Sequence, residues 1–282
     1  MSGAVAALLA DGRLHLQHGP IDLIVEAFGD DGEVTLAYRQ AVDRFGDILP
    51  TLVSELPALR RPVGEAYPLF RGPVARRMAA AVWPHRSVFI TPMAAVAGAV
   101  ADEMLQAMMA GRMLDKAYVN NGGDIAFHLA PGQSLWAGLF SQALDGAVML
   151  TDDRPVRGIA TSGQGGRSFS LGIADSATVL ARTAAAADAA ATLVANAVDV
   201  DHPAIARRPA RELDPDSDLL DRPVTIAVGP LPPERVAEAL DRGIAEAQRL
   251  RRCRLIDGAA VSLRGQWRIE ADGTALAEAR SG

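Results

Sequence analysis

Strand-like and helix-like segments follow one another along this chain without the strict alternation that builds a parallel sheet. Alternating or continuous apolar runs bounded by Gly, Pro or Asp predict strands at 14–17, 21–28, 87–90, 117–119, 125–129, 135–140, 148–151, 158–160, 168–171, 178–181, 224–228, 259–263 and 266–269. Helical periodicity predicts helices at 34–49, 73–83, 94–109, 184–198 and 233–252, with a break at Pro50 before a second short helical piece. This order favours an α+β fold, a layered sandwich of largely antiparallel sheet with packed helices.

The chain is long enough for a large hydrophobic core. It has 282 residues, of which 49% are hydrophobic, and this suits either one large domain or two small ones. Residues 201–222 are rich in Pro, Asp and Arg and lack periodicity, so we expect an irregular excursion there. We predict a single domain over residues 1–282 that contains this excursion.

Charge and cysteine content argue against several classes of protein. The net charge of −6 offers no electrostatic footprint for nucleic acid or for an anionic membrane. Cys253 is the only cysteine, which excludes an intramolecular disulfide and a cysteine-cluster metal site. Residues 1–10 have no basic flank, and the apolar stretch 88–109 is interrupted by Pro92 and carries two acidic residues. We therefore expect neither a signal peptide nor a membrane span, and a cytoplasmic protein.

A ladder of polar residues crosses the alanine-rich segment 184–198. Asp188, Thr192 and Asn196 are its only polar side chains, and their spacing of four places them on one face of a helix. A carboxylate in apolar surroundings must be paired, neutralised or bound to a metal. An Asp carboxylate with a Thr hydroxyl and nearby carbonyls is an oxygen-only set that suits Mg²⁺ or Ca²⁺. The alternative is that Asp188 caps a neighbouring loop while Thr192 bonds back to its own helix.

Two glycine-rich loops precede this helix. Residues 120–124 read Asn-Asn-Gly-Gly-Asp, and paired glycines allow backbone to approach a ligand closely, although they also form plain turns. Residues 160–167 read Ala-Thr-Ser-Gly-Gln-Gly-Gly-Arg and offer hydroxyls, amides and a cation that suit phosphate oxygens. Neither loop matches a P-loop or a dinucleotide fingerprint.

These motifs occur in the order and spacing of the ApbE superfamily, the FAD:protein FMN transferases, over about residues 91–198. Residues 91–102 are similar to the family's segment ending in Gly-x-x-x-Asp, which gives Gly98 and Asp102. Residues 119–125 resemble its Val-Asn-x-Gly-Gly-Asp/Glu-Ile loop, residues 160–163 its Thr-Ser-Gly turn, and residues 187–192 its Ala-Asp-Ala-x-x-Thr helix. Four ordered matches are more specific than any one of them.

The resemblance implies an ApbE-like fold and a set of site residues. Asp188 and Thr192 would hold Mg²⁺ and act as the catalytic residues, with a backbone carbonyl in residues 94–97 as a third contact. The cofactor, FAD or a related diphosphate, would be bound by Asn120, Gly122, Gly123, Asp124, Thr161, Ser162, Gly163 and Arg167. In the family the ion assists phosphoryl transfer, which passes FMN to a hydroxyl of a flavoprotein or hydrolyses FAD.

The chain also departs from the transferase pattern. Ala97 stands where the transferases carry Lys before the glycine, and residues 168–179 replace the family's His-Ile-Ile-Asp-Pro-x-Thr-Gly stretch. The chain thus resembles the shorter, poorly characterised cytoplasmic branch of the superfamily. Arg167 and Asp175 are candidate substitutes, and Asp175 is equally compatible with a turn at a strand end.

Three functions remain open from the sequence. The first is a Mg²⁺-dependent enzyme that acts on FAD or a relative, with a small-molecule cofactor and a flavoprotein acceptor as partners. The second is a non-catalytic protein that binds a flavin or assists cofactor assembly. The third is a structural or interaction protein that reuses the fold. The oligomeric state is open, with a homodimer as one arrangement.

Overall fold

The computed structural model describes residues 3–141, 144–166, 168–271 and 276–277. The chain divides into two compact units. Unit 1 comprises Met1–Leu135, Thr151–Ile159 and Arg182–Asp188, and unit 2 comprises Trp136–Leu150, Ala160–Ala181 and Ala189–Gly282. Four elements contribute residues to both units: β6 (Ser134–Ser141), β7 (Leu144–Thr151), β8 (Gly158–Ser162) and α5 (Ala184–Ala197).

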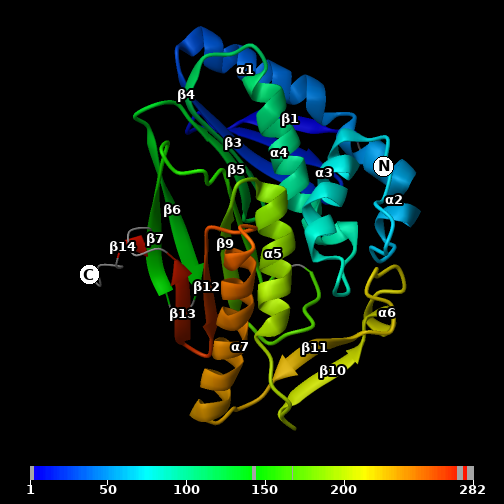
Figure 1. Ribbon diagram of the computed structural model, residues 1–282. Helices are drawn as coiled ribbons and strands as arrows, with labels where there is room; N and C mark the ends of the chain where they lie inside the picture. The colour runs from blue at the N-terminus through cyan, green and yellow to red at the C-terminus, as the bar shows by residue number, and fades with distance from the viewer. Residues whose placement is uncertain (1–2, 142–143, 167, 272–275, 278–282) are drawn as a thin grey trace. The chain divides into compact units, whose positions relative to one another are not determined.

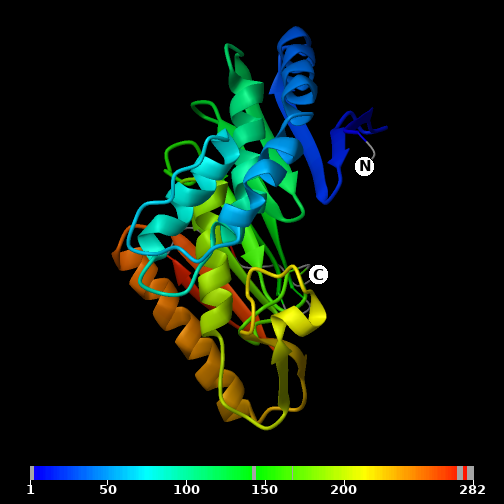
Figure 2. The ribbon, with the colours of Figure 1, turned by 90° about the vertical axis from the view of Figure 1, so that its right-hand side faces the viewer.

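Unit 1 is built on an antiparallel sheet in which neighbouring strands follow the order β1-β2-β3-β4-β5-β8. Its strands are β1 (Val5–Leu8), β2 (Leu14–His18), β3 (Ile21–Gly29), β4 (Leu114–Asn121), β5 (Asp124–Leu129) and the first residues of β8. Buried and half-buried side chains alternate along most of β3 and β4, because successive residues of a strand point to opposite faces. Figure 2 shows the dark blue strands near the N-terminus at the edge of this sheet.

Helices cover one face of the unit 1 sheet. Helix α4 (Val96–Met109) packs on β4 and β5, and α1 (Asp31–Phe45) packs on β3 and on α4 (Figure 1). The remaining helical segments are α2 (Ile48–Leu59), α3 (Pro73–Val82), and two short 3₁₀ turns, η1 (Trp83–His85) and η2 (Pro92–Ala95). Fully buried Phe45, Met104 and Met108 belong to the core of this layer.

The strands of unit 2 that belong to the nine-stranded sheet follow the order β9-β12-β13 and pair antiparallel. These strands are β9 (Ser176–Ala181), β12 (Gly258–Leu263) and β13 (Gln266–Ala271), and α7 (Pro233–Arg252) packs on β12 and β13. The other elements are β10 (Ile205–Pro209), α6 (Ala210–Leu213), β11 (Pro223–Val228) and β14 (Leu276–Ala277). Strands β10 and β11 pair with each other, and β7 lies between β14 and β6 in a small sheet.

The predicted α+β class, with largely antiparallel sheet and packed helices, is confirmed by these strand pairings and helix contacts. The stretch 201–222, expected to be irregular, holds strand β10 and the one-turn helix α6. Within the part of the chain that the structure describes, no helix is both long and apolar enough to span a bilayer.

Two of the predicted strands are wrong. Residues 87–90 follow η1 as a turn and coil and form no strand. The Ile90 oxygen accepts a bond from Val63 N, in the loop before α3, at 2.9 Å. Residues 168–171 form no ladder either. The Ser170 oxygen accepts a bond from Thr225 N of β11 at 2.9 Å, but the next N–H, that of Leu171, bonds to the Asn196 side chain at 3.0 Å. Short apolar runs cannot be distinguished from buried coil by periodicity alone.

The first helical region also differs from the prediction. The break falls at Gly46 and Asp47, and Pro50 lies in the first turn of α2. Proline is tolerated there because the first N–H groups of a helix have no partner within the helix. Strand β1 was not predicted, since its four residues are all exposed and carry no alternation.

Candidate functional site

Helix α4 and the first turn of α5 meet at a glycine. A Cβ atom on Gly98 would lie 2.2 Å from the Ala184 carbonyl oxygen and 2.7 Å from the Ala185 nitrogen. Gly158 of β8 is under the same restriction, because its Cβ would lie 2.2 Å from the Ala184 nitrogen. The start of α5 therefore has backbone on two sides at distances that only glycine permits.

Asp102 lies one turn after Gly98 on α4 and caps α5. Its Oδ1 and Oδ2 accept hydrogen bonds from Ala184 N and Ala185 N, both at 2.9 Å. Thr183 Oγ1 accepts a further bond from Ala186 N at 3.1 Å. A carboxylate at this position satisfies N–H groups that lack a partner in the helix and interacts favourably with the helix dipole. Asp102 thereby fastens α5 to α4.

Asp188 makes the reverse contact, from α5 to α4. Its Oδ2 accepts a hydrogen bond from Gly98 N at 3.0 Å, and its carboxylate also accepts one from Ala97 N. Both N–H groups belong to the first turn of α4, which begins at Val96. The capping alternative for Asp188 therefore describes real contacts, although the capped segment is the start of a helix and not a loop.

The charge of Asp188 is in an unfavourable setting. Burial raises the pKa of the half-buried Asp188 well above its ordinary value, and the charges of Asp124 and, more weakly, Asp102 raise it further. The bonds from Gly98 and Ala97 act in the opposite direction. Burial also raises the pKa of Asp102. A cation beside Asp188 and Asp124 would favour the ionised form of both carboxyl groups.

The loop at residues 120–124 is the turn of the β4–β5 hairpin. Asn121 pairs with Asp124 across the hairpin, and the two residues between them, Gly122 and Gly123, have φ angles of +65° and +111°. Asn120 Oδ1 accepts a hydrogen bond from Gly123 N at 2.8 Å. The two glycines therefore meet the conformational demand of a two-residue turn, and their role in cofactor binding stays a prediction.

Asn121, which is absent from the predicted site residues, links this hairpin to α4. Its side chain is only 5% exposed, and its Nδ2 donates to the Ala97 carbonyl oxygen at 3.1 Å. Ala97 lies in the segment 94–97 that the resemblance implies as the source of a carbonyl ligand. A signal for Asn121 exists in the pattern, because Ala117 and Val119, at the preceding positions on the same face of β4, are apolar and fully buried.

The second glycine loop belongs to unit 2. Thr161 Oγ1 and Thr178 Oγ1 are hydrogen-bonded at 2.9 Å, and Ser162 ends β8. A Cβ atom on Gly163 would lie 2.6 Å from the Asp175 carbonyl oxygen. The Asp175 side chain accepts a bond from Arg264 N at 2.6 Å, so its contacts agree with the turn interpretation.

The remaining predicted residues are Thr192 and Arg167. Thr192 is half-buried and follows Asp188 by four residues in α5, within the part of the helix that belongs to unit 2. Asn196, the third rung of the polar ladder, accepts a bond from Leu171 N at 3.0 Å and so has a structural role. Arg167 lies outside the described residues.

The oxygen atoms around Asp188 in unit 1 suit a hard divalent cation. They include the carboxylate of Asp188 and that of Asp124, whose charge acts on Asp188, and Mg²⁺ is typically bound through oxygen by one or two carboxylates and water. The Ala97 carbonyl oxygen accepts the bond from Asn121. Among the described residues no group of three His, Cys, Asp or Glu side chains is placed to hold a metal. The carboxylate oxygens beside Asp188 are of the ligand type that Mg²⁺ prefers.

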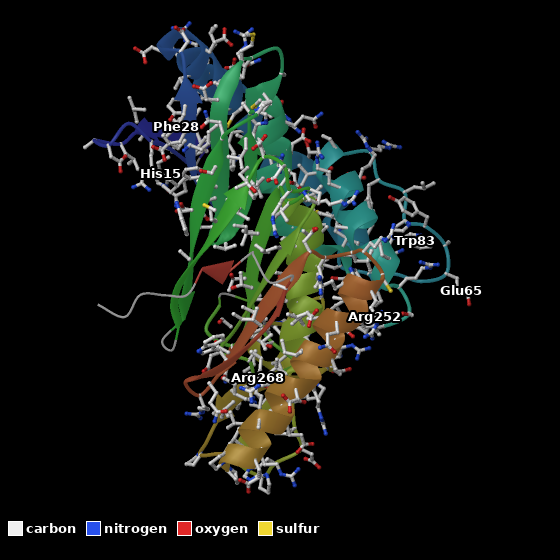
Figure 3. The ribbon with its side chains drawn as sticks, turned by 60° about the vertical axis from the view of Figure 1, so that its left-hand side comes forward. His15, Phe28, Glu65, Trp83, Arg252 and Arg268 are labelled. Atoms are coloured by element: carbon white, nitrogen blue, oxygen red, sulfur yellow. The ribbon has the colours of Figure 1, made fainter. Side chains whose placement is uncertain are left out.

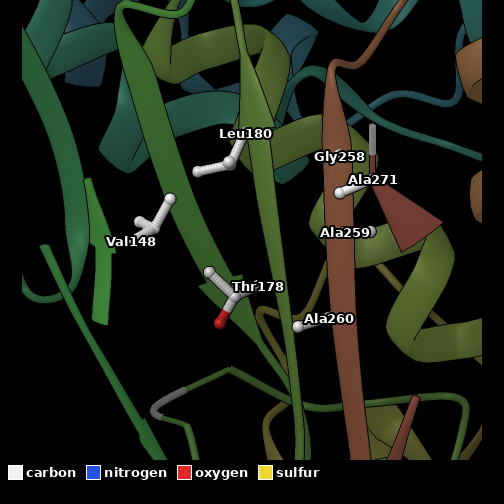
Figure 4. Close-up of a pocket in the computed structure, with 7 residues that line it drawn as sticks. All are labelled: Val148, Thr178, Leu180, Gly258, Ala259, Ala260 and Ala271. Carbon is white, nitrogen blue, oxygen red and sulfur yellow. The ribbon is translucent and has the colours of Figure 1, made fainter. Parts of the chain in front are cut away.

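A small pocket in unit 2 does not suit a charged cofactor (Figure 4). It is lined by Val148, Thr178, Leu180, Gly258, Ala259, Ala260 and Ala271. Its only side-chain hydroxyl, that of Thr178, is hydrogen-bonded to Thr161. A diphosphate needs donors or cations, and this lining is apolar.

Known proteins resemble this chain in fold and in part of its sequence. A mutant of the flavin transferase ApbE from Vibrio cholerae has a TM-score of 0.52 and 12% sequence identity, with 97% of this chain and 98% of that chain covered. At this identity the likeness establishes the fold alone. UPF0280 proteins from Methanothrix thermoacetophila and Methanopyrus kandleri are 40% and 34% identical over 134 and 168 residues.

These relatives are matched only in part. The two alignments cover 46% and 54% of this chain and 54% and 61% of the relatives, so the chain spans little more than half the length of the curated relatives it matches. A family model described as "AbpE bacteria" matches residues 6–269. The predicted resemblance to the ApbE superfamily is confirmed, and the chain belongs to the AbpE bacteria family.

Proposed function

We propose that this protein binds Mg²⁺ at Asp188 and acts on a flavin-type diphosphate cofactor, by FMN transfer from FAD or by FAD hydrolysis. The observation that carries the proposal is the position of the Asp188 carboxylate, which accepts the Gly98 N–H at 3.0 Å and lies within the influence of the Asp124 charge. Burial and this neighbouring charge raise the pKa of Asp188. Such a site gains most from a bound cation. Membership of the AbpE bacteria family supports the choice of a flavin.

Each proposed residue has a distinct task. Asp188 is the first ligand of the ion and, with Thr192, the proposed catalytic pair. Bound there, Mg²⁺ would neutralise charge on the diphosphate oxygens. Gly122 and Gly123 have no side chain that would keep a ligand from their backbone. The remaining cofactor-binding proposals are Asn120, Asp124, Thr161, Ser162, Gly163 and Arg167.

The main alternative is a non-catalytic protein that binds a flavin or assists cofactor assembly. Two observations favour it: Ala97 stands where the transferases carry Lys, and both Asp102 and Asp188 already serve as helix caps. The main proposal, that of a flavin-directed enzyme, has three further parts: a flavoprotein acceptor, a cytoplasmic location and a homodimer.

The test is metal-dependent cleavage of FAD. With Mg²⁺ present we expect AMP release, measured by chromatography, to fall at least about tenfold in Asp188→Ala, because loss of a catalytic metal removes several kcal/mol of transition-state stabilisation. Asp43→Asn, an exposed change on α1, is the matched control. Equal AMP release by wild type and Asp188→Ala would refute the role of Asp188.

A second assay distinguishes transfer from hydrolysis. We expect this protein to label a standard flavoprotein acceptor far less than a complete transferase does, as measured by in-gel flavin fluorescence. The departures at Ala97 and at residues 168–179 should weaken positioning of the acceptor, and misplacement of about 1 Å reduces rates about a hundredfold. FAD binding without cleavage would favour the non-catalytic alternative. Absence of FAD binding at any magnesium concentration would contradict the flavin assignment.

A further inference from the structure

The segment from Leu56 to Ile90 carries an excess of basic residues in a chain that is acidic as a whole. It contains six arginines and one acidic residue, Glu65, whereas the whole chain has a net charge of −6. Arg77 of this set is paired with Glu103 at 3.0 Å. Arg61 and Arg71 lie in the loop between α2 and α3, Arg76 lies in α3, and Arg86 directly follows η1.

Aromatic and apolar side chains are exposed within the same segment. Tyr67 is 44% exposed and Leu69 is 89% exposed. The rings of Tyr67 and Trp83 meet edge-to-face with centroids 5.1 Å apart, and the Arg86 guanidinium lies 4.5 Å from the centroid of the Trp83 ring. We call this set the arginine–aromatic surface; it consists of Arg61, Tyr67, Leu69, Arg71, Trp83 and Arg86.

The loop that carries this surface is held in place by backbone contacts. Both carboxylate oxygens of Glu55 accept hydrogen bonds, from Arg71 N at 2.7 Å and from Gly72 N at 2.9 Å. Val63 N donates to the Ile90 oxygen at 2.9 Å, which places Arg61 and its neighbours beside the residues that follow Arg86. Figure 3 labels Glu65 and Trp83 on this cyan segment of unit 1. A partner would meet a preformed surface and lose little ordering entropy.

The composition of this surface is that of a protein-binding site. Trp, Tyr and Arg dominate the residues whose removal weakens protein interfaces most. A single exposed Leu on a protein surface is common and would not by itself indicate a binding site. Here Leu69 is two residues from Tyr67, which contacts Trp83. The three arginines of the surface, Arg61, Arg71 and Arg86, outnumber the two carboxylates of this region, Glu55 and Glu65, so the surface carries a net positive charge.

We propose that the arginine–aromatic surface docks an acidic segment of a partner protein that carries an exposed apolar side chain. Charge complementarity selects the acidic segment, and Leu69 with Tyr67 supplies the apolar contact. A protein segment fits better than nucleic acid, because the chain as a whole is negative and would repel a long polyanion. This inference is independent of the proposed flavin chemistry, since no residue of the surface belongs to the Asp188 site.

The test measures binding of labelled peptides by fluorescence anisotropy. The probe is a short peptide rich in Glu and Leu, and the comparison probes are the same peptide with Lys for Glu and a short single-stranded RNA. We expect the wild type to bind the Glu peptide in preference to both, with affinity that falls as salt rises. Preference for RNA or for the Lys peptide, or no binding of the Glu peptide at low salt, would overturn the proposal.

Variants locate the binding to the surface. Arg61 and Arg71 have exposed side chains. We therefore expect the double variant Arg61→Glu, Arg71→Glu to retain the wild-type melting temperature and to bind the Glu peptide with an affinity lower by roughly tenfold or more. Leu69→Ser should lower the affinity for the Glu peptide roughly tenfold, because it removes an apolar contact. Arg39→Glu, at an exposed position on α1, reverses a charge elsewhere in unit 1 and should leave binding unchanged. Equal weakening by Arg39→Glu would mean that net charge alone controls binding and would refute the site.

Discussion

Asp102 and Asp188 each cap the helix that carries the other. Asp102 on α4 accepts hydrogen bonds from Ala184 N and Ala185 N of α5, and Asp188 on α5 accepts one from Gly98 N of α4. The two helix starts are thereby held together by two carboxylates. The same arrangement brings both carboxylates, whose charges disfavour each other, to the place proposed for a cation.

Removal of the Asp102 cap should destabilise the protein. Asp102→Ala leaves two N–H groups of α5 without their charged acceptor, so we expect the free energy of unfolding to fall by about 2 kcal/mol. Asp30→Ala, which removes the cap of α1 with its single bond to Gly32 N, should lose about 1 kcal/mol. Urea unfolding measures both. An Asp102→Ala variant as stable as wild type would show that the cap contributes nothing.

The close contact at Gly98 should tolerate no side chain. In Gly98→Ala the new Cβ would overlap the Ala184 backbone at 2.2 Å, so we expect a loss of about 3 kcal/mol or more, or failure to fold.

Gly46→Ala is the matched control for Gly98→Ala. Gly46 has φ of −56° and ψ of −34°, and a Cβ there meets nothing within 4 Å. It should be neutral or stabilising by about 0.5 kcal/mol. Thermal unfolding compares the two variants, and similar melting temperatures would contradict the steric argument.

Much of the fold could be predicted from periodicity. The helix predicted at 233–252 is α7 as observed, and the alanine-rich helix at 184–198 is α5 within one residue. The errors occur where apolar residues lack a ladder partner, as at residues 87–90 and 168–171. Exposed β1 was missed because it carries no buried face. Sequence pattern indicates which residues are buried, and strand pairing does not follow from burial in these segments.

The candidate site was predictable only in part. The four-residue spacing identifies Asp188, but its contact with Gly98, ninety residues earlier in the chain, depends on tertiary structure. Gly98 and Asp102 entered through the resemblance, and the sequence alone does not say that one is a steric requirement and the other a cap. Asn121 was missed because an Asn beside two glycines has the composition of an ordinary turn.

Asp188 should make stability fall as pH rises. Its pKa is higher in the folded protein than in the unfolded chain, so between those two values the folded state binds more protons and stability decreases with increasing pH. Asp188→Asn removes this titration, and we expect a smaller decrease in the urea midpoint between about pH 4 and about pH 8. Asp43→Asn, exposed on α1, should keep the wild-type decrease. An unchanged decrease in Asp188→Asn would be inconsistent with the raised pKa.

Magnesium should stabilise the folded protein through Asp188. An ion that binds only the folded state raises the free energy of unfolding by about 2.7 kcal/mol at a hundred times its Kd. The gain should be larger at about pH 8 than at about pH 5, because ion binding requires an ionised carboxylate and protons compete for Asp188. Thermal unfolding over a magnesium series, with calcium in parallel, measures the effect.

Two variants decide whether this stabilisation belongs to the proposed site. Asp188→Asn should lose most of the magnesium-dependent rise in melting temperature, because a neutral amide is a poor substitute for a carboxylate ligand. Asp199 is also half-buried, burial also raises its pKa, and it is paired with Arg207. Asp199→Asn should keep the full magnesium-dependent rise in melting temperature. Since both changes remove one negative charge, net charge cannot explain a difference between them. If Asp188→Asn responds to magnesium as wild type does, the ion binds elsewhere, and Asp188 is a helix cap and nothing more.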